Sequence, residues 1–144
     1  AGHVALPQAH AQVPYVDTND IADVVVAALL DDRHNGKVYQ LTGPETWTFE
    51  AVVAQVAKAT NREIGFTAIP MEAYMRELKA AGLPEDYVWL INYLFTEVLV
   101  AEGNNAVTDD IQRVLGRPPR TMQDYIQETA ASGVWDPARL PVGA

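Results

Sequence analysis

The chain has 144 residues, of which 49% are hydrophobic and 20% charged, a composition typical of one folded globular protein and not of a disordered or fibrous one. Ten basic and 19 acidic residues give a formal net charge of −9, which argues against nucleic acid and anionic membrane surfaces as partners. Cysteine is absent, which excludes a disulfide framework, a thiolate nucleophile and a cysteine-based zinc site. Because no secretory leader is visible either, we expect a cytoplasmic protein.

Three segments within the first 70 residues have the composition of short strands. Each is rich in β-branched or aromatic residues and is bounded by turn residues; they are residues 13–17, 37–41 and 64–68. Pro14 indicates that the first segment lies at a sheet edge or at a strand start, because proline cannot donate a hydrogen bond to a ladder.

Two helices are predicted between these strands. Apolar residues recur at helical spacing from Asp17 to about Asp31, and again from Thr48 to the polar turn at residues 60–62. Asp17 is expected to cap the first helix, and Asp20, three residues on, is expected to complete a capping box in its first turn.

This β-α-β-α-β order predicts a partial α/β layer over residues 1–70. After Pro70 the sequence predicts a helical subdomain over residues 71–133. Its four helical stretches are separated by turns rich in glycine, proline and asparagine, and they cover residues 72–81, 85–101, 109–115 and 122–131. The tail, residues 134–144, is rich in proline and glycine and is expected to pack loosely.

The stretch 85–101 is apolar nearly all round, yet shorter than the roughly 20 residues that a membrane span needs. A helix without a polar face should be buried on most sides. We therefore expect part of its surface to meet a ligand, a second copy of the chain or a missing piece of protein. Its aromatic side chains are candidates for the wall of a pocket for a planar ligand, with core or subunit packing as the alternative; they are Tyr87, Trp89, Tyr93 and Phe95.

The motifs that bind dinucleotides are missing from the sequence. The glycines form no Gly-x-Gly-x-x-Gly turn and no Walker-type loop, so no cofactor-binding residue is assigned. No tyrosine precedes a lysine by four positions, so a Tyr/Lys proton relay has no local candidate. The single serine, Ser132, lacks the nucleophile elbow of a hydrolase. The catalytic residues stay unknown at this point.

Metal and acid–base chemistry have few candidates. The three histidines show no metal-ligand spacing and are expected at turns or on the surface, so no metal site is predicted; they are His3, His10 and His34. Asp109 and Asp110 are either a carboxylate pair for acid–base work or, with Thr108 as N-cap, the acids of a helical first turn.

Five short motifs follow one another along the chain: Val13-Pro-Tyr-Val-Asp-Thr-Asn-Asp-Ile-Ala-Asp23, Gly36-Lys-Val-Tyr-Gln-Leu-Thr-Gly-Pro44, Gly82-Leu-Pro84, Val107-Thr-Asp-Asp110 and Gly116-Arg-Pro-Pro119. In this order they resemble the C-terminal portion of the NmrA-like, atypical short-chain dehydrogenase/reductase family of NAD(P)H-binding proteins. The resemblance runs from about Val13 to about Glu128. It implies an α/β fold, the C-terminal part of a Rossmann-like fold with about three short strands, plus a helical lobe on the substrate side.

Members of that family carry about as many residues again before this region, including the glycine-rich turn and most cofactor contacts. The resemblance therefore implies NAD(P)H as the family's cofactor, which this chain alone is not expected to bind. The implied partner is a second copy or a complementary N-terminal Rossmann half, and the implied ligand is small and apolar.

The first hypothesis for function is the substrate-binding half of an NAD(P)H-dependent oxidoreductase that acts on a small aromatic or quinone-like acceptor. Trp89 and Tyr93 would then be wall residues, and Tyr15 a hydroxyl donor. A non-catalytic regulatory or dimerising module that binds small molecules is the alternative. A cofactor-independent isomerase or cyclase, with Asp109 or His34 as base, is a third hypothesis.

Overall fold

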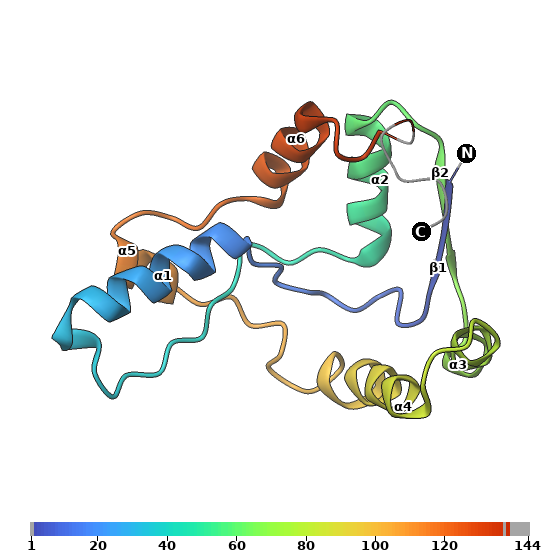
Figure 1. The fold of residues 1–144 in the computed structure, drawn as a ribbon, viewed down its shortest axis with the longest axis horizontal. Helices are drawn as coiled ribbons and strands as arrows, with labels where there is room; N and C mark the ends of the chain where they lie inside the picture. Colours follow the sequence, from blue (N-terminus) through green and yellow to red (C-terminus); the bar gives the residue numbers. More distant parts are fainter. Residues whose placement is uncertain (1, 137, 139–144) are drawn as a thin grey trace. The chain divides into compact units, whose positions relative to one another are not determined.

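The computed structural model describes residues 2–136 and 138, and it divides the chain into two compact units that are described separately (Figure 1). Unit 1 consists of Ala1–Val13 and Trp47–Asn105, and unit 2 consists of Pro14–Thr46 and Ala106–Ala144. Each unit thus combines two separate stretches of sequence. The division by composition into residues 1–70, 71–133 and 134–144 stays a prediction, and most of the predicted loose tail lies outside the described residues.

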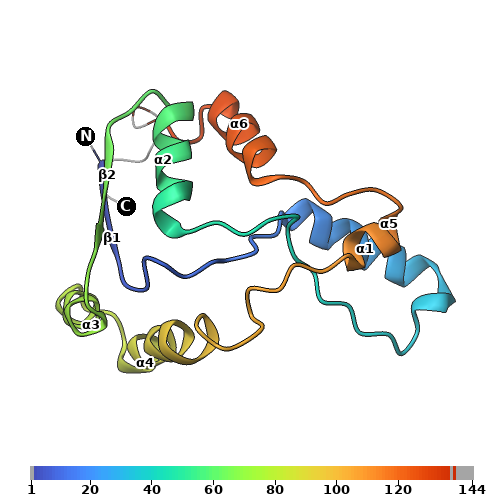
Figure 2. The ribbon, with the colours of Figure 1, turned by 180° about the vertical axis from the view of Figure 1, so that it is seen from behind.

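Unit 1 is built on two parallel strands, β1 (Gly2–Leu6) and β2 (Ile64–Ala68), which pair from Gly2 opposite Ile64 to Leu6 opposite Ala68. Parallel strands need a crossover between them, and helix α2 (Phe49–Ala59) leads into β2 and packs on it (Figures 1 and 2). The strand predicted over residues 64–68 is therefore confirmed. Strand β1 was not predicted from the sequence.

Two helices follow β2 in unit 1. Helix α3 (Met71–Ala80) contacts both β1 and helix α4 (Glu85–Tyr93). The predicted helix over 85–101 is only partly correct, because after Tyr93 it widens into a π-helical segment, η2 (Leu94–Val98). The Thr96 hydroxyl donates a hydrogen bond of 2.9 Å to the Asn92 carbonyl. In a regular α-helix the Thr96 backbone amide would bond that same oxygen, so the side chain and the backbone compete for one acceptor.

Among the described residues of unit 2, the helical segments are α1 (Thr18–Leu30), the short 3₁₀ turn η1 (Asp32–His34), α5 (Asp110–Leu115) and α6 (Met122–Ser132). Helix α1 packs on α5, where Val24 and Ile111 are buried. Ile126 of α6 is also buried. Among the residues that the structure describes, no helix is long and apolar enough to cross a bilayer.

The strands predicted over residues 13–17 and 37–41 are wrong. The first segment forms a single bridge, in which Val13 and Trp47 exchange backbone hydrogen bonds of 3.0 and 2.9 Å. In the second segment the Gln40 amide donates to the Asp110 carboxylate at 2.7 Å, and the Gln40 carbonyl accepts from the Thr108 hydroxyl. Side chains thus satisfy the polar backbone groups that a neighbouring strand would otherwise bond.

Candidate functional site

A buried carboxylate organises unit 2. Asp20 is inaccessible to solvent, and its two oxygens accept hydrogen bonds of 2.7 Å from Arg117 Nη1 and from the Arg120 backbone amide. Arg117 also donates to Asp23 at 2.5 Å, and these hydrogen bonds to Asp20 and Asp23 raise the pKa of the guanidinium, which keeps it charged. The segment before α6 is thereby fixed to the first turn of α1.

This arrangement corrects the predicted capping box. Asp17 does cap α1, because its Oδ1 accepts from the Asn19 amide at 2.8 Å. Asp20 does not complete the box, because both of its oxygens bind arginine groups from a segment about a hundred residues away in sequence. Sequence spacing reveals the acid but not its distant partners.

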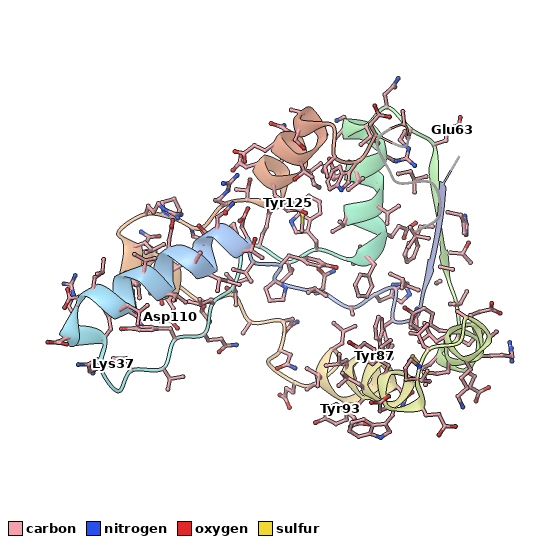
Figure 3. The ribbon with its side chains drawn as sticks, viewed as in Figure 1. Lys37, Glu63, Tyr87, Tyr93, Asp110 and Tyr125 are labelled. Atoms are coloured by element: carbon pink, nitrogen blue, oxygen red, sulfur yellow. The ribbon has the colours of Figure 1, made fainter. Side chains whose placement is uncertain are left out.

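A pocket of about 250 Å³ opens in unit 2 where the starts of α1 and α6 meet. The residues that line it are Tyr15, Val16, Asp17, Thr18, Arg120, Thr121, Met122 and Tyr125. Figure 3 labels Tyr125 on α6. Tyr15 is thus the one predicted site residue that the structure assigns to this pocket.

The charges of the pocket are largely balanced. Asp17 Oδ2 is buried and lies 3.2 Å from Arg120 Nε, an ion pair without hydrogen-bond geometry. The Arg120 guanidinium also bonds Glu128. A cation that already faces two carboxylates attracts an anionic ligand weakly, so the pocket favours an uncharged molecule with polar groups.

Two tyrosines and a methionine supply the apolar surface of the pocket. Burial raises the pKa of the Tyr15 phenol, because the charged phenolate is disfavoured there, and the protonated hydroxyl can donate a hydrogen bond. Tyr125 makes an edge contact with Trp135, with ring centroids 6.1 Å apart. Aromatic rings and the thioether of Met122 are suitable walls for a planar ring.

The backbone at Tyr15 is held by a close approach of Gly43. The Gly43 amide donates to the Pro14 carbonyl at 3.3 Å. A β-carbon at position 43 would lie 1.9 Å from the Tyr15 carbonyl oxygen, so only glycine fits there. The Thr42-Gly43-Pro44 turn therefore positions one wall of the pocket.

The other four predicted site residues belong to unit 1. On α4, Trp89 and Tyr93 stack with centroids 5.6 Å apart and planes at 10°, and both are exposed, as is Tyr87. Figure 3 labels Tyr87 and Tyr93. Phe95 differs, because it packs on Phe49 and Tyr74 at 5.9 and 5.7 Å. Their predicted role as pocket walls stays a prediction.

The acid–base candidates His34 and Asp110 take part in hydrogen bonds within unit 2. His34 Nδ1 lies 2.7 Å from the Tyr39 hydroxyl. Asp110, labelled in Figure 3, is buried, accepts from the Gln40 amide and pairs with Arg113 at 2.6 Å. Within residues 2–136 and 138, no three histidine or acidic side chains form a group that could hold a metal ion.

The expected N-cap of α5 is also corrected. Asp109 occupies the cap position without a side-chain hydrogen bond. Thr108 instead bonds the segment 40–42, since its amide donates to Thr42 Oγ1 at 3.0 Å and its hydroxyl donates to the Gln40 carbonyl. A threonine before two acids is a frequent cap pattern, but here tertiary contacts take its polar groups.

Three residues of the pocket were not predicted from the sequence: Arg120, Met122 and Tyr125. Arg120 directly follows the Gly116–Pro119 motif. The position of that motif just before a predicted helix was the one sequence feature that could have pointed to Arg120 as a site residue. Tyr125 lies in the first turns of α6, where aromatic residues are ordinarily read as packing residues.

The chain matches no protein-family profile. It is 29% identical over 131 residues to the NAD(P)H azoreductase of Xenophilus azovorans, which covers 91% of this chain and 46% of the azoreductase. It is 28% identical over 130 residues to the uncharacterized oxidoreductase YesF of Bacillus subtilis, 90% of this chain and 45% of that protein. The NADPH-dependent quinone oxidoreductase of Escherichia coli, solved with NADPH, matches with a TM-score of 0.74 at 18% identity, over 88% of this chain and 44% of that one.

The chain thus spans slightly less than half the length of these relatives, and the region that it matches is their C-terminal half. The predicted α/β fold, the C-terminal part of a Rossmann-like reductase, is confirmed by the structural likeness. These similarities fit the resemblance to the C-terminal portion of the NmrA-like, atypical short-chain dehydrogenase/reductase family.

Proposed function

We propose that the chain is the acceptor-binding half of an NAD(P)H-dependent oxidoreductase that reduces a small aromatic or quinone-like molecule. The proposal is supported by relatives named as azo and quinone reductases. The observation that carries it is the pocket between the starts of α1 and α6, with Tyr15 and Tyr125 in its walls. In such enzymes the nicotinamide supplies the hydride.

The residues at this pocket do not fit the dinucleotide itself. A pyrophosphate favours a helix start with free amides and no negative charge. Here Asp17 caps α1, and Thr121 and Asp124 form a capping box at α6. We therefore assign the pocket to the acceptor, and propose that an N-terminal Rossmann half holds the cofactor.

The pocket offers an acceptor three kinds of contact. Its ring would lie against Tyr15, Met122 or Tyr125, and an acceptor carbonyl would take a hydrogen bond from the Tyr15 hydroxyl. The balanced charge of Arg120 favours a neutral quinone over a sulfonated or carboxylated dye.

Binding of 1,4-naphthoquinone to the purified chain, followed by NMR chemical shifts, tests this proposal without any cofactor. We expect Tyr15→Phe to weaken binding about 2- to 10-fold, the effect of one lost hydrogen bond. Tyr39→Phe, at a tyrosine of unit 2 that bonds His34 and does not line this pocket, is the matched control and should leave binding unchanged. A wild-type chain that does not bind naphthoquinone, or a Tyr15→Phe variant that binds equally well, contradicts the proposal.

A second candidate is a non-catalytic dimerising module. The exposed, stacked Trp89 and Tyr93 on α4 favour it, because such rings often lie in protein interfaces. Light scattering should then show a dimer that Trp89→Ala dissociates. A monomer at high concentration eliminates this candidate. No observation favours an isomerase or cyclase.

A further inference from the structure

Helix α1 has one covered face and one uncovered face. Asp20 and Val24 are buried on the side that packs against α5, and the two hydrogen bonds to Asp20 fix this orientation. The large apolar residues elsewhere on the helix are exposed, from 36% for Ile21 to 80% for Leu29 and 81% for Leu30. The uncovered face is therefore a defined feature of unit 2.

The exposed residues have the geometry of a packing surface. They form two adjacent rows with a spacing of four residues, the ridges by which helices pack on their neighbours; the rows are Ile21-Val25-Leu29 and Ala22-Val26-Leu30. No polar residue interrupts residues 24–30. A helix that is apolar on nearly all sides is typical of a protein interior.

Two observations identify what would cover this face. The chain matches only 45–46% of the length of its relatives, so each relative carries a further portion of similar size. Helix α1 directly follows the extended segment 13–17, as a helix follows a strand in an α/β layer, where such helices pack on the sheet.

We propose that the uncovered face of α1, residues 21–30, docks on the dinucleotide-binding half that the relatives carry. This inference rests on the proposed function and specifies the surface through which the two halves join. A second copy of the chain fits less well, because two chains of formal charge −9 repel each other and the last turn of α1 contains no basic residue.

Co-expression tests the docking surface. The probe is the N-terminal half of the Xenophilus azovorans azoreductase, tagged and produced together with the full 144-residue chain. We expect a 1:1 complex by size-exclusion chromatography with light scattering, and slower hydrogen exchange of the α1 amides in the complex. The double variant Leu29→Asp/Leu30→Asp should weaken the complex at least tenfold while the chain remains folded, because both side chains are exposed.

Leu90→Asp, an exposed leucine on α4, is the matched control and should leave the complex intact. No complex with the wild-type chain, or a complex that the α1 double variant leaves unchanged, overturns the proposal. A homodimer that protects the α1 amides also overturns it, in favour of a second copy. Naphthoquinone binding by the chain alone is independent of docking, so failure there refutes the proposed function and not the docking surface.

Discussion

The two units are held together by different interactions. Unit 2 buries polar groups, among them Asp20, Thr42 and Asp110, and pairs them with arginines and backbone amides. Unit 1 combines a parallel strand pair with an aromatic cluster in which Phe95 contacts Phe49 and Tyr74. Buried charges fix geometry but are costly when one partner is lost, whereas apolar packing tolerates adjustment. The candidate pocket lies in the unit with the more strictly defined geometry.

Among the substitutions that compare the two units, Asp20→Asn in unit 2 should lower the free energy of unfolding most. The variant keeps the shape of the side chain but removes the charge that two donors share, so we expect a loss of about 3 kcal/mol in the free energy of unfolding. Urea denaturation followed by circular dichroism measures it.

Asp23→Asn is the control, because Asp23 pairs with the same guanidinium but is exposed, and its pair should contribute at most about 1 kcal/mol. Equal losses of unfolding free energy for Asp20→Asn and Asp23→Asn would show that the buried Asp20 contact stabilises the chain no more than the exposed Asp23 contact does.

Phe95→Ala tests the cohesion of unit 1. The ring is half-buried and stacks on Phe49, so its removal should cost about 2 kcal/mol, less than a fully buried phenylalanine. The exposed Trp89, on the same helical stretch, is the control, and Trp89→Ala should cost less than about 1 kcal/mol. If Trp89→Ala destabilised the chain more than Phe95→Ala, α4 would have a covered aromatic face that this structure does not show.

Gly43→Ala compares backbone fit in the two units. The new β-carbon would lie 1.9 Å from the Tyr15 carbonyl oxygen, and the backbone has to move, at a cost of about 1.5 kcal/mol. In unit 1, Gly65→Ala places its β-carbon 2.7 Å from the His3 ring, which can rotate away, so thermal unfolding should change little. Equal stability of Gly43→Ala and the wild type would contradict the close packing at Tyr15.

Local patterns predicted part of this structure. Apolar spacing located α1, α2 and β2, and the cap at Asp17 followed from residue type alone. The buried role of Asp20 depends on Arg117, 97 positions away, and nothing in a local window reveals that contact. The predicted strand over residues 37–41 failed for the same reason, because Asp110 and Thr108 take its backbone groups. The pocket likewise combines residues 15–18 with residues 120–125.

The alkaline pH dependence of stability gives the smallest expected effect. Burial raises the pKa of Tyr15 above the value of about 10 in the unfolded chain, because the charged phenolate is disfavoured inside unit 2. The resulting contribution to stability is fully present below the unfolded pKa and is lost as the pH rises through the folded pKa. Tyr15→Phe should therefore flatten the fall in stability above about pH 10, whereas Tyr87→Phe, at a side chain that is 59% exposed, should not. Urea denaturation from pH 8 to 11 measures this difference, and identical profiles for both variants would show that the Tyr15 hydroxyl is as well solvated as an exposed one.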